Sequence, residues 1–442
     1  MPSIFDDTPN LVPQRPLARL ELGLLLFLHL VTCCLSLIYI AELYVTYQLV
    51  MFDKTHIFMA TLNVVLFAAA SLLFTFGRFS FGYFLGFYFY TMIFGYLWLV
   101  AFSKFPYNHT LAAASAFASA LAFLVPALFI TSPIKQRFVL SARALDSLLS
   151  FILVLAAAVI AAGAANNFKL VRLADIYHFR DEIDLPAWLR YATGVTSNAL
   201  LPFAFACFVA RGNRLRAAAA LLLLLLFYPI TLTKLALFAP FWLLFLALLS
   251  RFFEARTCVV LSLFLPVSAG VVLMLLFKSE DLSYDHMISF FGAINFRMIA
   301  FPSIALDFYN DFFSTHRLTY FCQITFLKPF IDCPYTDQLS IVMQKAYQIG
   351  NFNASLFATE GIASVGMILA PFAVLACGLV ISLGNRLSSG LPSRFILLSG
   401  GILPQVFLNV PLATTLLTNG AAFLFLLWYV TPRMMFKQKA SE

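Results

Sequence analysis

Four charged residues stand at the edges of long apolar stretches or in the polar segments between them: Arg180, Lys234, Arg297 and Glu360. A guanidinium or ammonium group can stabilise the negative charge that develops on a phosphate leaving group. A carboxyl group at the mouth of an apolar segment can accept a proton or orient a cation, and an ionisable group in such a place is a functional candidate. These residue types predict a site for a phosphorylated ligand.

Further candidates lie in the same polar segments. Tyr177 precedes Arg180 by three residues, so on a short helix a ring and a guanidinium point to the same side, which suits a sugar or a phosphate. His316 is a candidate general base because an imidazole exchanges protons near neutral pH. Three other residues are candidates for substrate binding, namely Arg190, Arg317 and Asn353.

The elements that position these residues must be membrane helices. Hydrophobic residues make up 62% of the 442 residues and charged residues only 11%, and a soluble core cannot hide so much apolar surface. Lipid offers no hydrogen bonds, so only helices or a closed barrel satisfy the backbone. Continuous apolar runs such as 221–227 lack the alternation of barrel strands. The sequence therefore predicts an all-α integral membrane protein.

Apolar runs of about 20 residues, the length that crosses a bilayer, predict about twelve transmembrane helices, within a range of ten to fourteen. They form a single polytopic membrane domain over 1–442. Two large loops interrupt them, 165–195 and 278–355, and both are expected to contain amphipathic helices. The predicted spans are 20–47, 57–76, 79–102, 111–131, 146–164, 196–211, 215–232, 234–250, 257–277, 357–383, 395–409 and 411–431.

The distribution of Lys and Arg predicts the orientation. Most basic residues fall in one alternate set of short connections and in the two terminal segments, whereas the opposite short connections hold only Lys54, Lys104 and Lys234. Basic residues stay in the cytoplasm, so both termini are predicted to be cytoplasmic and both large loops to face outward. Contact with anionic membrane lipids accounts for the net charge of +8, and no nucleic-acid partner is needed.

The cysteines and the absence of cofactor motifs narrow the chemistry. Cys322 and Cys333 lie in the second large loop, where an oxidising space would allow a structural disulfide. The other cysteines lie in predicted spans. The sequence contains no His/Cys spacing of a metal site and no glycine-rich phosphate loop. Neither a metal nor a cofactor is therefore expected.

Short motifs along 165–431 carry a resemblance to a known family. They are Tyr177-x-x-Arg180, Leu201-Pro-Phe-Ala-Phe-Ala-Cys207, Thr233-Lys234, Arg297-x-x-x-x-Pro302, Asn351-Phe-Asn-Ala-Ser-Leu-Phe357 with Gly361 and Gly366, and Pro411-Leu-Ala-Thr-Thr415. In their order and placement they resemble the O-antigen polymerase family (Wzy), closest to the pseudomonad type. The first 160 residues are similar to the family in hydropathy only.

The resemblance implies a GT-C-like, polymerase–ligase architecture in the bacterial inner membrane, with a periplasmic active site. Because Arg and Lys side chains supply fixed positive charge there, no metal is expected to be needed. It implies that a growing glycan moves from undecaprenyl diphosphate to the nonreducing end of an incoming undecaprenyl-diphosphate-linked repeat unit. Arg180 and Arg297 would bind the diphosphate with Lys234 beneath them, and His316 or Glu360 would serve as base, or Glu360 would orient an arginine. A chain-length regulator protein is a further implied partner. Substrate-binding roles fall on Tyr177, Arg190, Arg317 and Asn353.

Two other functions stay open. An O-antigen ligase shares the architecture but transfers the finished chain to the lipid A core. A lipid-linked sugar flippase would need a polar path through the spans, where ionisable residues are few, chiefly His29 and Glu42. The lipid that accumulates in a deletion strain would distinguish the polymerase from the ligase.

Overall fold

The computed structural model describes residues 16–46, 49–172, 176, 179, 183, 185–324, 326–348 and 355–436. Within these ranges the protein is all-helical and forms no strand. Eleven helices are long and apolar enough to cross a membrane, which confirms the prediction of an all-α, multi-pass membrane protein. They are Arg19–Val45, Lys54–Phe76, Phe81–Phe102, His109–Phe129, Ala142–Asn166, Ala187–Ala210, Arg214–Thr231, Lys234–Phe252, Ala255–Lys278, Tyr284–Thr315 and Phe357–Ser388.

Several of these spans are built from more than one helical segment. The α-helices described up to residue 388, of which α16 lies outside the eleven spans, are α1 (Pro16–Thr46), α2 (Ile57–Ala68), α3 (Leu72–Phe76), α4 (Phe81–Leu99), α5 (His109–Phe129), α6 (Ala142–Asn166), α8 (Ala187–Val195), α9 (Leu201–Ala210), α10 (Arg214–Leu226), α11 (Tyr228–Thr231), α12 (Lys234–Phe252), α13 (Ala255–Lys278), α14 (Tyr284–Phe291), α15 (Phe301–Thr315), α16 (Leu339–Tyr347) and α17 (Ser364–Ser388). Short 3-10 or π segments join many of them.

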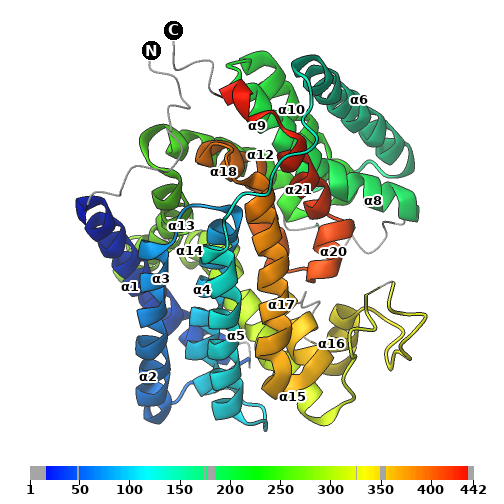
Figure 1. Ribbon diagram of the computed structural model, residues 1–442. Coiled ribbons are helices and arrows are strands. Elements are labelled where there is room, and N and C mark those ends of the chain that lie inside the picture. The colour runs from blue at the N-terminus through cyan, green and yellow to red at the C-terminus, as the bar shows by residue number, and fades with distance from the viewer. Residues whose placement is uncertain are drawn as a thin grey trace.

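Helix α4 is the centre of the bundle. All its residues are buried, as expected for a helix that is apolar on every side and surrounded by other helices. It packs against α2, α5, α13, α15 and α17. Figure 1 shows α4, α5 and α17 running side by side through the middle of the molecule, with α6 at the periphery. The bundle is therefore organised around α4 and the α5–α17 pair.

The predicted spans up to 357–383 each overlap one of the long apolar helices. The helix at the predicted span 196–211 begins earlier, at Ala187, so the end of the predicted loop 165–195 is part of it. The last two predicted spans are broken instead. Residues 395–409 form α18 (Ser393–Ser399) and α19 (Leu403–Phe407), and residues 411–431 form α20 (Leu412–Leu417) and α21 (Ala421–Val430). Gly420 before α21 has φ of 79°, a backbone conformation that glycine adopts without strain. Two continuous spans over 395–431 are therefore not present.

The helix Tyr284–Thr315 lies inside the predicted loop 278–355. Tyr284 packs on Phe277 at the C-terminal end of α13, with ring centroids 5.7 Å apart. Towards its other end, Asp307 accepts a hydrogen bond from Ser103, just beyond the C-terminal end of α4. Helices α4 and α13 are the third and ninth spans, so in an alternating bundle both end on the same side. The helix therefore begins and ends on one side of the bundle, although its length would allow it to cross.

Three π-helical segments interrupt the spans, two of them next to the predicted loops and one inside the predicted loop 278–355. They are η4 (Thr196–Leu200), η5 (Gly292–Ala300) and η6 (Phe357–Ala363). A π turn adds a residue per turn, re-aims side chains and is frequent at functional sites. Two predicted site residues lie on them, Arg297 on η5 and Glu360 on η6.

In Figure 1, α15, α16 and the start of α17 occupy one end of the molecule, and α9, α10, α12 and α18 gather at the other.

Candidate functional site

Glu360 is the most distinctive of the predicted residues because it is a buried acid. It lies on η6 and only 5% of its surface is exposed. Its Oε1 accepts a hydrogen bond of 3.3 Å from the backbone N–H of Ala413, in the first turn of α20. Its Oε2 has no hydrogen-bond partner within the described part of the chain. Leaving a buried polar atom without a hydrogen-bond partner costs free energy. We therefore expect a ligand, a proton or a water beside Oε2.

Three hydroxyl groups share this feature with Glu360. Tyr309, Ser355 and Thr359 are all buried, and their hydroxyl oxygens lack a hydrogen-bond partner among the described residues. Tyr309 comes from α15, which packs on η6, and lies within electrostatic reach of Glu360. Ser355 and Thr359 precede Glu360 closely in the same segment of the chain, and we call Tyr309, Ser355, Thr359 and Glu360 the Glu360 cluster. Its unsatisfied donors and acceptors suit a ligand that carries hydroxyl groups.

Local backbone contacts hold η6 in place. The N–H of Thr319 donates to the carbonyl of Ala363 over 2.8 Å, and the N–H of Tyr320 donates to the carbonyl of Ser364 over 3.1 Å. The helix then turns at Gly366, whose φ of 75° favours glycine. The segment after α15 is therefore tied to the start of α17, and this fixes the side of the bundle on which Glu360 lies.

A row of aromatic rings leads away from the Glu360 cluster. Tyr309 and Phe313 lie one helical turn apart on α15, with ring centroids separated by 5.9 Å. Phe313 contacts the ring of Tyr335 at 6.0 Å, edge to face. The Tyr335 hydroxyl donates to the carbonyl of Arg317 over 2.8 Å. Aromatic faces in series form a surface on which an apolar or sugar face can pack.

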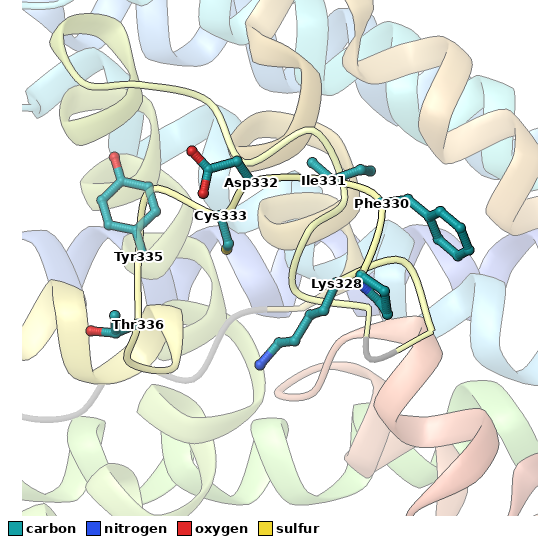
Figure 2. A pocket seen from close by; sticks show the side chains of 8 residues that line it. Lys328, Phe330, Ile331, Asp332, Cys333, Tyr335 and Thr336 are labelled. Carbon is teal, nitrogen blue, oxygen red and sulfur yellow. The ribbon is translucent and has the colours of Figure 1, made fainter.

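Tyr335 also lines an open pocket of about 450 Å³ in the segment that follows α15. Figure 2 shows Tyr335 at one side of the pocket, Phe330 at the other and Asp332 between them in this view, with the Lys328 amine extending away from Phe330. Cys333 in the wall forms a disulfide with Cys322. The disulfide expected from the sequence is therefore present, and it constrains the loop that carries this pocket.

A second polar group fastens α15 to the end of α4. The Tyr107 hydroxyl donates to Asp307 Oδ1, and the Ser103 hydroxyl donates to Asp307 Oδ2 over 3.0 Å. Asn310 Nδ2 donates to the Tyr96 hydroxyl over 2.8 Å. Burial, followed by the neighbouring Tyr96 and Asp307, raises the pKa of Tyr107 well above its usual range, so Tyr107 stays a neutral donor. This network positions α15, and with it Tyr309.

Sequence reasoning did not single out Asp307, Asn310 or Tyr309 as site residues. Asp307 and Asn310 lie three residues apart and so share a face of α15. That spacing was the available signal, but an amphipathic helix on the membrane surface would show the same pattern. A helix on the membrane surface would not pack against α4, whereas α15 does. Only the tertiary structure shows this packing.

The other predicted residues that the structure describes do not join the Glu360 cluster. Arg297 is exposed on η5, with its guanidinium 5.1 Å from the centre of the Phe301 ring. It precedes Tyr309 by twelve residues, roughly 18 Å along a helix at 1.5 Å per residue. His316 is exposed and stacks on Phe312, with ring centroids 3.9 Å apart. Arg317 is exposed beside it.

Two further candidates, Arg190 and Lys234, lie on other helices. Arg190 is exposed on α8, and Lys234 opens α12 after the capping residue Thr233. Helix α8 approaches the end of α20, because a side-chain atom added at Gly194 would come within 2.5 Å of the Thr418 carbonyl. Helix α20 thus links α8 to Glu360. Tyr177, Arg180 and Asn353 lie outside the described residues.

Over the described ranges, no group of three or more His, Cys, Asp or Glu side chains is arranged to hold a metal ion. The chain matches no protein-family model, no curated protein and no solved structure. The fold therefore defines an all-α, multi-pass membrane protein, and the family suggested by the short motifs stays a prediction.

Proposed function

We propose that this chain is a membrane glycosyltransferase that polymerises lipid-linked O-antigen repeat units in the bacterial inner membrane. The donor is a glycan on undecaprenyl diphosphate, and the acceptor is the nonreducing end of an undecaprenyl-diphosphate-linked repeat unit. The observation that carries the proposal is the Glu360 cluster: one oxygen of a buried carboxyl group and three buried hydroxyls on η6, α15 and the residue Ser355 have no hydrogen-bond partner among the described residues. Such a cluster suits the binding and deprotonation of a sugar hydroxyl.

In this mechanism Glu360 Oε2 accepts the proton of the acceptor hydroxyl while that oxygen attacks the anomeric carbon of the donor sugar. The bond between the anomeric carbon and the diphosphate oxygen breaks, and undecaprenyl diphosphate leaves with the electron pair. The Ala413 N–H, 3.3 Å from Oε1, holds the carboxyl group in place. Tyr309 and Thr359 orient the acceptor sugar through their hydroxyls.

Positive charge for the diphosphates of the two substrates would come from Arg297, Lys234 and Arg190, together with Arg180, which lies outside the described residues. Fixed cations stabilise the leaving group throughout the reaction, so the proposed reaction needs no metal ion. The leaving diphosphate is bonded to the attacked anomeric carbon and therefore lies beside the attacking hydroxyl. Arg297, well separated from Tyr309 along the helix, is better placed to bind the diphosphate of the acceptor lipid, at the other end of the repeat unit. His316, exposed on Phe312, fits glycan binding better than proton transfer.

The pocket at Tyr335 would hold the sugars beyond the acceptor residue. It is open, it carries an aromatic ring and both a carboxylate and an amine, and the Tyr309–Phe313–Tyr335 row connects it to the Glu360 cluster. A ligase would also need a donor glycan site. The acceptor distinguishes the two enzymes, and a chain-length regulator would act with the polymerase alone.

The test combines genetics with a purified system. A deletion strain should carry surface lipid capped with a single repeat unit, whereas accumulation of long chains on undecaprenyl diphosphate would instead identify a ligase. Purified protein given lipid-linked repeat units should make polymer in excess chelator. Loss of polymer in chelator with recovery in magnesium or manganese would refute the metal-independent mechanism.

A further inference from the structure

A groove opens at the end of the molecule opposite α15 and α16, between α9, α10, α12 and α18 (Figure 1). Its volume is about 350 Å³, and its walls are mostly aliphatic. Three arginines line it, each from a different helix: Arg214 of α10, Arg251 of α12 and Arg394 of α18. At this end of the bundle the segments that connect the helices are rich in Lys and Arg, and this end is the predicted cytoplasmic side.

Helices α10 and α12 contribute matching stripes to the groove. On α10 the lining residues Arg214, Ala218 and Leu221 follow helical spacing, and on α12 Arg251, Leu248 and Leu244 do the same in the reverse direction. Each stripe therefore has an arginine at the mouth and a leucine seven residues deeper, about 10 Å at 1.5 Å per residue. The groove is cationic at its mouth and apolar along its length.

The groove is open to the surrounding bilayer as well as to the membrane surface. Leu244 and Leu248 are 49% and 54% exposed, so about half of each side chain would contact lipid. Alanines at the middle of the stripe leave room for a chain between the helices. A lipid can therefore enter sideways, with its chain along the leucines and its headgroup at the arginines.

Charge at the mouth is strongly one-sided. No Asp or Glu is among the groove-lining residues in the described part of the chain. Two acids on the predicted cytoplasmic side pair with arginines outside the groove lining, Asp146 with Arg211 and Glu254 with Arg256 at 2.7 Å. Arg214 is also the first residue of α10, where the helix dipole is positive. A bound anion would relieve this concentration of positive charge.

We propose that the groove binds one anionic glycerophospholipid, with its phosphate between Arg214, Arg251 and Arg394 and one acyl chain along Leu221 and Leu244. Basic pockets between membrane helices on the cytoplasmic side recognise anionic headgroups in this way. The site is independent of the proposed glycosyl transfer, which uses the opposite end of the bundle.

The test uses the full chain purified in detergent. Phosphatidylglycerol and phosphatidylcholine with identical acyl chains are titrated, and bound lipid is counted by native mass spectrometry. Phosphatidylglycerol should bind more tightly. Changing the three groove arginines to Gln together should weaken it on the order of a hundredfold, from about fivefold per arginine, which corresponds to about 1 kcal/mol each. The matched control replaces three exposed arginines outside the groove by Gln and should leave binding within about twofold: Arg78, Arg137 and Arg143.

A second variant separates a lipid site from a simple anion site. Ala218 is exposed on the groove wall, so Ala218→Phe fills the acyl channel without disturbing the core. It should weaken phosphatidylglycerol binding, and millimolar inorganic phosphate should fail to displace the lipid. Unchanged binding in the triple arginine variant would overturn the proposal. So would displacement by phosphate together with unchanged binding in Ala218→Phe.

Discussion

Replacement of Glu360 by Gln is the sharpest test of the candidate site. Gln has the same length, and its amide oxygen can still accept the hydrogen bond from the Ala413 N–H. It cannot take up a proton from an acceptor hydroxyl. The change therefore isolates the proton-accepting role of Oε2, which has no partner in the described structure, from the structural role of Oε1.

The expected loss follows from general-base catalysis, which typically contributes 10²- to 10⁴-fold to a rate. We expect the turnover of Glu360→Gln to fall by that factor, about 3 to 5 kcal/mol of barrier, with little change in substrate affinity. Thermal stability should stay within about 0.5 kcal/mol, since no hydrogen bond between described residues is removed.

The assay is single-turnover extension of a lipid-linked repeat unit by purified protein, with unfolding temperature measured in parallel. The matched control is Glu42→Gln, a second Glu that forms a surface ion pair with Lys278 at 3.8 Å. The control should retain turnover and stability. If Glu360→Gln extends the acceptor at the wild-type rate, Glu360 is not the base, and the Glu360 cluster loses its catalytic interpretation.

Four further predictions test the supports of the site. Cys322→Ser should loosen the loop that carries the Tyr335 pocket, because a disulfide that closes a loop of this length stabilises the fold by about 3 kcal/mol. Limited proteolysis within the loop should be faster than in the wild type, and an unchanged rate would count against this role of the disulfide. Tyr107→Phe should destabilise the protein by about 1 to 3 kcal/mol by removing a donor to buried Asp307, and an unchanged unfolding temperature would argue against the network. Arg297→Ala should abolish polymer, and Arg297→Lys should restore little of it, since Lys lacks the paired donors of a guanidinium. Polymer of normal length distribution from the alanine variant would remove Arg297 from the site. A reporter fused after Asp311 should be periplasmic, and cytoplasmic activity would reverse the predicted orientation.

The sequence by itself determined the class of protein and most of its helices. Hydropathy suffices because a backbone in lipid must satisfy its hydrogen bonds locally, so each apolar run folds as a helix whatever surrounds it. Glu360 was predicted as a site residue on similarly local grounds, since an acid at the start of an apolar run is unusual wherever the run packs in the bundle. The possible disulfide between Cys322 and Cys333 was likewise visible from the separation of two cysteines in one polar loop.

The tertiary structure decided which side chains meet. Tyr309 and Glu360 come from segments far apart in the chain, and Ala413 from a third, so no local pattern could bring them together. Breaks in the last predicted spans depended on backbone angles such as that of Gly420, which composition does not reveal. The arginine-lined groove depended on α10 and α12 packing with their stripes face to face. Burial against distant neighbours is set by the packing of the whole bundle, and hydropathy along the chain cannot report it.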